Sequence, residues 1–146
     1  MVKGVEFRFS KLDEMWEVLK FIGNSCGSYR FTVADQSLCS KGVDVTIPHE
    51  FDSAFFNEMV HQQMVPERLV IHAYPIGERF HLIDDFMTFY RSPCAMIILM
   101  YDCWYMEIYC KDYSWSKTLL CLGEKLIGAQ AREIESVVDY RRDFYI

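Results

Sequence analysis

The sequence has no long apolar run, no closely spaced cysteine pair and no glycine-rich phosphate loop. Its longest apolar stretch, residues 96–110, is interrupted at Asp102-Cys103 and is shorter than the roughly 20 residues that span a membrane. The 7 glycines form neither GxGxxG nor GxxxxGK, so we expect no phosphate-binding loop. The N-terminus lacks the apolar core and cleavage site of a secretory signal, which predicts a cytoplasmic protein without a membrane segment.

The spacing of the cysteines and histidines matches no metal-binding motif. The 6 cysteines form no CxxC pair and no zinc-ribbon spacing, and in a reducing cytoplasm they are expected to remain thiols. No two of the 4 histidines, at positions 49, 61, 72 and 81, have the i, i+4 spacing of a helical metal site. We therefore predict no metal and no cofactor.

The charge is acidic and evenly spread. The net charge is −6, divided equally between residues 1–64 and 65–146, without a basic patch. A nucleic-acid partner is therefore not expected. The acidic surface chiefly favours solubility, although it would also suit a basic protein partner. The length of 146 residues and the 51% hydrophobic content predict one folded domain over residues 1–146.

Hydrophobic periodicity predicts an α+β fold, with a largely antiparallel sheet and packed helices. The order is β-α-β-β-α-β-α-β-β-α-β, and the second half has the ferredoxin-like order of elements. The tail is ambiguous, because 134–138 alternates as a strand while 131–140 has helical propensity; we favour the strand. Strands are predicted at 4–9, 29–34, 43–47, 69–74, 95–101 and 104–111. Helices are predicted at 12–22, 51–60 and 86–90, and a further long helix begins at Ser114 or Ser116 and ends at Ile127, before Gly128.

Residues 95–111 are predicted to form a β-hairpin with two unequal faces. If Asp102-Cys103 is the tip, strict alternation places Ala95, Ile97, Leu99, Tyr101, Trp104, Met106, Ile108 and Cys110 on the core face. The other face is rich in methionine and tyrosine, which are common at interfaces. A helix could equally bury it, and a register slip of one residue would exchange the two faces. The candidate interaction residues on that face are Met96, Met100, Tyr105, Glu107 and Tyr109.

Candidate catalytic chemistry is sparse. Cys103 at the hairpin tip and Cys26 beside Gly27 are the thiols expected to reach solvent, and a nucleophilic thiol needs a base within hydrogen-bonding reach. Neither has a histidine nearby in the sequence. Asp84 and Asp85 are adjacent, but helix capping accounts for them. We assign no catalytic residue.

Two segments carry a family resemblance. These are Leu69-Val-Ile-His-Ala-Tyr-Pro-Ile-Gly77 with Asp85-Phe-Met-Thr-Phe-Tyr-Arg-Ser-Pro-Cys94, and Ile97-Ile-Leu-Met-Tyr-Asp-Cys-Trp-Tyr-Met-Glu-Ile-Tyr-Cys-Lys111. Over residues 69–146 the chain resembles a small uncharacterised bacterial family of domains of unknown function, DUF2691. The resemblance supports the hairpin and implies no activity and no functional residues.

Two classes of function stay open at this point. A small acidic α+β chain without a catalytic motif favours a non-catalytic protein-interaction module, of which a toxin-immunity-like protein is one version. Its partner would be another protein or a second copy of the chain. The alternative is a small enzyme or ligand-binding protein with a pocket lined by cysteine and histidine.

Overall fold

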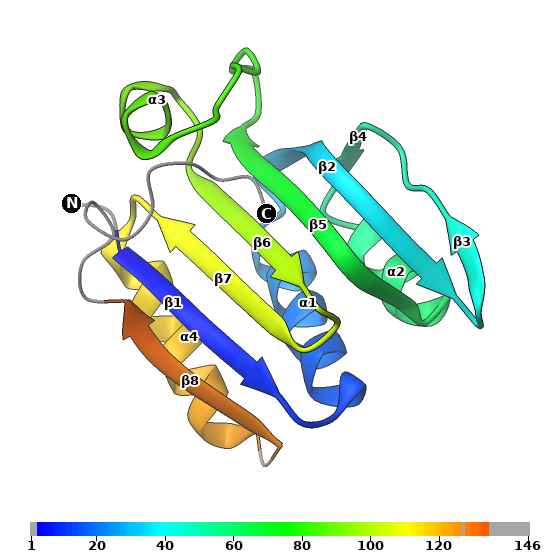
Figure 1. Ribbon diagram of the computed structural model, residues 1–146. Helices are drawn as coiled ribbons and strands as arrows, with labels where there is room; N and C mark the ends of the chain where they lie inside the picture. The colour runs from blue at the N-terminus through cyan, green and yellow to red at the C-terminus, as the bar shows by residue number, and fades with distance from the viewer. Residues whose placement is uncertain (1–2, 127, 135–146) are drawn as a thin grey trace.

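The computed structural model describes residues 3–126 and 128–134, which form eight strands and four helices (Figure 1). In chain order these are β1 (Lys3–Phe9), α1 (Leu12–Ser25), β2 (Tyr29–Ser40), β3 (Val43–Val45), β4 (Glu50–Asp52), α2 (Phe55–His61), β5 (Met64–Pro75), α3 (Phe86–Arg91), β6 (Met96–Tyr101), β7 (Tyr105–Cys110), α4 (Tyr113–Lys125) and β8 (Ala129–Ile134).

All eight strands belong to one sheet, in which every recorded pairing is antiparallel. Their spatial order is β3-β2-β5-β6-β7-β1-β8, and β4 pairs with β2 beside β3. The N-terminal strand β1 therefore lies between β7 and β8, in contact with two strands from the far end of the chain (Figure 1).

Helices α1, α2 and α4 cover one face of the sheet, which we call the helix face (Figure 1). In α1, Met15, Val18, Leu19 and Ile22 are buried, because i, i+3, i+4 spacing places them on one side of the helix. They meet strand residues such as Phe7 and Phe31 in the main core. At Gly23, α1 approaches α2 so closely that an added Cβ would lie 2.8 Å from the Cβ of Phe56.

The opposite face of the sheet, which we call the second face, carries a smaller apolar cluster. Val70, Ile97 and Leu99 from the central strands join Phe89 of α3 and Ile83 of the preceding loop. Helix α3 lies at the end of the sheet where β5 stops and β6 begins (Figure 1). Asp85 caps it as expected, because its carboxylate accepts a hydrogen bond from the Thr88 backbone at 2.7 Å.

The predicted α+β class and the order of elements are confirmed. Strand β4 is an addition: Phe51, assigned to the second helix, lies instead in this three-residue strand. The second half has the predicted β-α-β-β-α-β order, but β5 and β6 pair directly and antiparallel, so α3 is not a crossover helix. The tail forms a strand, β8, that begins earlier than predicted; positions 136 and 138 lie outside the described residues.

The predicted hairpin exists, but its register is wrong by one residue. Tyr101 pairs with Tyr105 and Met96 with Cys110, so the connection is the three-residue loop 102–104. Asp102 and Cys103 both have positive φ, at 53° and 64°, and a preferred Asn-Gly pair is absent there. The helix face therefore receives Met96, Ile98, Met100, Met106, Ile108 and Cys110, which mixes the two predicted faces.

Candidate functional site

A row of polar and aromatic side chains crosses the second face near the hairpin tip. Strand register places Gln130 beside Arg8, Arg8 beside Tyr105, Tyr105 beside Tyr101, and Tyr101 beside Arg68. Directly paired residues of an antiparallel sheet point to the same face. Five strands, β8, β1, β7, β6 and β5, thus contribute one side chain each to this row, which we call the Arg/Tyr row.

The middle of the Arg/Tyr row is a ring stack. The rings of Tyr101 and Tyr105 are 5.3 Å apart and inclined by 8°. The guanidinium carbon of Arg8 lies 5.1 Å from the centre of the Tyr105 ring, which is within cation–π distance. At the other end, Arg68 Nε donates to Asp35 Oδ2 at 2.6 Å. One arginine of the row is thus paired with a carboxylate, while the other rests on an aromatic ring.

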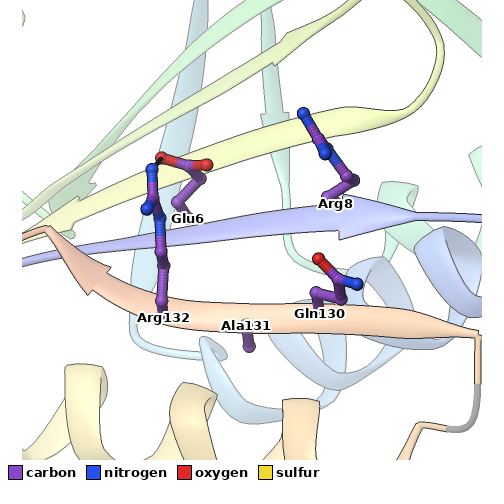
Figure 2. A pocket seen from close by; sticks show the side chains of 5 residues that line it. All are labelled: Glu6, Arg8, Gln130, Ala131 and Arg132. Atoms are coloured by element: carbon purple, nitrogen blue, oxygen red, sulfur yellow. Dashed lines mark hydrogen bonds and ion pairs between the residues drawn. The ribbon is translucent and has the colours of Figure 1, made fainter.

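A pocket opens beside Arg8, over strands β1 and β8. Its volume is about 370 Å³, and its walls are Glu6, Arg8, Gln130, Ala131 and Arg132. Figure 2 shows Glu6 and Arg132 facing each other across the two strands, with Arg8 and Gln130 further along the same strands. Arg132 Nη2 is 3.2 Å from Glu6 Oε2. Alternation gives the sequence signal for this site, since Glu6 and Arg8 lie on the wet side of an amphipathic strand.

The predicted interaction residues do not share a face. Met96 and Met100 are buried on the helix face, whereas Tyr105, Glu107 and Tyr109 lie on the second face. Glu107 and Tyr109 are buried too, and the Tyr109 hydroxyl donates to Glu107 Oε1 at 2.6 Å. The shifted register causes this correction. Of the five, Tyr105 alone is partly exposed, in the Arg/Tyr row.

The structure does not bring a cysteine and a histidine together. Among the described residues, no hydrogen bond joins the two residue types, and no cluster of three or more potential metal ligands occurs. Cys26 is buried, against its expected exposure, and burial raises the pKa of its thiol to about 12. Cys103 is partly exposed, and its pKa is raised by burial and by nearby acidic groups. Neither thiol has the lowered pKa of a nucleophile.

The rate of alkylation should therefore follow the exposure of each thiol in the structure. It should not single out Cys26 and Cys103, the two thiols that the sequence predicted to reach solvent. We expect a maleimide at neutral pH to label Cys121 first, because it is the exposed cysteine of the six, and Cys103 more slowly. Cys26, Cys94 and Cys110 are buried, with raised pKa values, and should react only when the protein unfolds. Mass spectrometry of labelled peptides gives the order. Labelling of Cys26 as fast as Cys121 would contradict this arrangement.

A second surface feature was missed in the sequence. Five of the eight large apolar side chains exposed in the described part of the chain lie in residues 76–91, which comprise the β5–α3 loop and α3. We call this stretch the β5–α3 segment. The Tyr74 hydroxyl anchors it, donating to the His81 carbonyl at 3.2 Å and accepting from the His81 amide at 3.0 Å. The exposed side chains are Ile76, Phe80, Leu82, Met87 and Tyr90.

The fold and surface describe an α+β protein with a helix-covered antiparallel sheet, a polar pocket and an exposed apolar segment. A family model described as "Protein of unknown function (DUF2691)" matches residues 52–142, more than half of the chain. The chain belongs to this family. No curated protein and no solved structure matches. In the part of the chain that the structure describes, no helix is long and apolar enough to cross a membrane.

The family match includes all of the β5–α3 segment and the β8 side of the pocket. It begins at Asp52, after β1, α1 and β2. Glu6 and Arg8 therefore lie outside the matched residues, although β1 is an inner strand of the sheet.

Proposed function

We propose that this protein is a non-catalytic interaction module that binds a protein partner through the β5–α3 segment. The observation that carries the proposal is the exposure of five large apolar side chains in one short segment. Leu82 is 81% exposed and Ile76 63%. Single exposed apolar residues are ordinary on protein surfaces, but a group of them favours an interaction site.

The way the segment is held supports this role. Tyr74 fixes the middle of the loop at His81, and its ring lies 5.0 Å from that of Phe80. Asp85 and Thr88 form a capping box at the start of α3. An anchored loop loses less conformational entropy on binding than an unconstrained one.

Charge favours a basic partner, since the chain carries −6, and opposite charge accelerates association. A toxin-immunity-like protein, which neutralises a basic toxin, is the narrower version of this proposal. The enzymatic alternative has less support, because burial raises the pKa of the buried thiols and none is hydrogen-bonded to a histidine in the described residues.

The test compares three baits in extract of the native host: the unaltered chain, Leu82→Asp and Val43→Asp. Val43 is the matched control, because it is 64% exposed but lies on β3, at the other edge of the sheet. We expect one stoichiometric protein on the unaltered chain and on Val43→Asp. Its recovery on Leu82→Asp should fall at least about 10-fold, because a buried charge disrupts an apolar interface.

Light scattering of the same three proteins separates a foreign partner from a second copy of the chain. A dimer that dissociates only in Leu82→Asp would assign the surface to self-association. Equal recovery of every bound protein on all three baits would contradict the role of the β5–α3 segment. Recovery of no stoichiometric protein, with all three baits monomeric, would contradict the interaction module itself.

A further inference from the structure

The pocket over β1 and β8 is separate from the β5–α3 segment. It lies towards the C-terminal end of β1, next to the hairpin tip, whereas α3 lies at the opposite end of the sheet (Figure 1). A smaller pocket of about 220 Å³ continues from it and shares Arg8 and Gln130 as lining residues. A volume of about 370 Å³ is within the range of small-molecule sites.

Arg8 is held in place without a carboxylate partner in the described residues. Its guanidinium carbon lies over the ring of Tyr105, 5.1 Å from the ring centre, and that ring is itself stacked on Tyr101. Neither an ion pair nor a side-chain hydrogen bond of Arg8 occurs among residues 3–126 and 128–134. The guanidinium carries five N–H donors, and the contact with Tyr105 is a cation–π contact that does not pair them with an oxygen acceptor. Arg8 is therefore a preorganised donor.

The other pocket residues set the charge of the ligand. Arg132 and Glu6 form an ion pair across β1 and β8, so their charges cancel. The residues that line the pocket therefore carry a net charge of about +1, which comes from Arg8. One uncompensated positive charge complements a singly charged anion better than a doubly charged one. Gln130 lies directly beside Arg8 on the neighbouring strand and adds an amide that donates or accepts a hydrogen bond.

We propose that this pocket binds a carboxylate. Its two oxygens accept hydrogen bonds from the guanidinium of Arg8, and the Gln130 amide contacts it from the side. A planar fork of donors matches a carboxylate in a way that the point charge of a lysine does not. The ligand is a singly charged carboxylate, supplied by a small organic acid or by an acidic side chain of a peptide.

The experiment follows the backbone amide resonances of the full chain by NMR during titration with four probes. These are sodium acetate, sodium benzoate, a five-residue peptide with a central glutamate, and inorganic phosphate. We expect acetate or benzoate to shift resonances of β1 and β8 with a Kd on the order of 1 mM. Tighter binding of the peptide would assign the site to a peptide side chain, and tighter binding of benzoate to a small organic acid.

Three variants test the mechanism. Arg8→Gln should weaken binding at least about 10-fold, because it removes the charged fork. Arg8→Lys keeps the charge and loses the fork, so it should also weaken binding. Arg79→Gln is the matched control, an exposed arginine on the β5–α3 loop, and should bind as the unaltered chain does. Thermal unfolding checks that each variant is folded.

Three outcomes would overturn the proposal: no shift in β1 or β8 with any carboxylate at concentrations well above 1 mM, equal binding by Arg8→Gln and the unaltered chain, or tighter binding of phosphate than of acetate. Unchanged binding by Arg8→Lys would show simple charge attraction and would reject the bidentate geometry.

Discussion

Replacing Gly123 with alanine is expected to lower the free energy of unfolding by about 2–3 kcal/mol. Gly123 lies on α4 where the helix crosses β8, and an added Cβ would be 2.3 Å from the Cβ of Ala131. It would also lie 3.2 Å from the Phe7 ring. Because atoms cannot approach so closely, α4 and β8 would have to move apart. Urea unfolding at neutral pH measures the loss.

A compensating change tests whether this contact is the cause. Ala131→Gly removes the atom that the new methyl group meets, so the double variant Gly123→Ala, Ala131→Gly should recover much of the stability. The glycine in β8 will itself reduce stability by about 0.5–1 kcal/mol. Gly27→Ala is the control, because a Cβ there meets nothing within 4 Å. A double variant whose loss equals the sum of the two single losses would contradict this explanation.

The second large effect is expected in acid. His72 is 3% exposed on β5, its Nε2 has no hydrogen-bond partner in the described structure, and burial lowers its pKa from 6.5 to about 4. Between these values the unfolded chain binds a proton that the folded protein does not. Stability contributed by neutral His72 is therefore present above about pH 6.5 and is lost as the pH falls through about 4. The loss amounts to about 3 kcal/mol.

The variant His72→Leu isolates this contribution from that of the carboxyl groups. It should match or exceed the unaltered chain in stability at pH 7, because it removes an unsatisfied buried nitrogen. Between pH 7 and pH 4, its free energy of unfolding should also fall by about 3 kcal/mol less than that of the unaltered chain. Urea unfolding at both pH values gives the difference. His61→Gln, at an exposed position on α2, should keep the full acid sensitivity. If His72→Leu loses as much stability between the two pH values as the unaltered chain does, the role of His72 is contradicted.

The helix-covered α+β fold was predictable because its elements follow local periodicity. Strand alternation and the i, i+3, i+4 spacing of α1 are properties of short windows, and they located most elements. Strand β4 has only three residues, Glu50–Asp52, which is too short for alternation to separate it from the helix that follows. The predicted strand at 69–74 is too short, because β5 begins at Met64 and contains Pro66, which lies opposite Leu38 next to a register irregularity in β2.

The hairpin shows where sequence reasoning fails for a physical reason. The strands were correctly located, but the loop length was set by turn geometry and tertiary hydrogen bonds. The Asp102 and Cys103 amides donate to the carbonyls of Glu67 and Pro66 on β5, which helps to fix the three-residue connection. Because side chains alternate with period two, this single additional loop residue moved one whole strand to the opposite face.

The candidate sites were harder to predict for another reason. The Arg/Tyr row joins residues that are far apart in the sequence, such as Arg8 and Gln130, and no local pattern indicates that β1 and β8 are neighbours. The apolar residues of the β5–α3 segment were visible, but composition alone does not separate a buried side chain from an exposed one. Leu82 and Ile83 are adjacent, and only the second is buried.

The position of β1 in the sheet has a consequence for synthesis on the ribosome. Both partner strands of residues 3–9, β7 and β8, are made about 100 residues or more after β1. During that interval β1 has no partner strand. Its apolar side chains Val5, Phe7 and Phe9 are all buried in the core of the folded protein. Strand β8 cannot pair until β1 has docked. Strand β1 therefore stays unpaired until β7 has been made, and an unpaired apolar strand is prone to aggregate during synthesis.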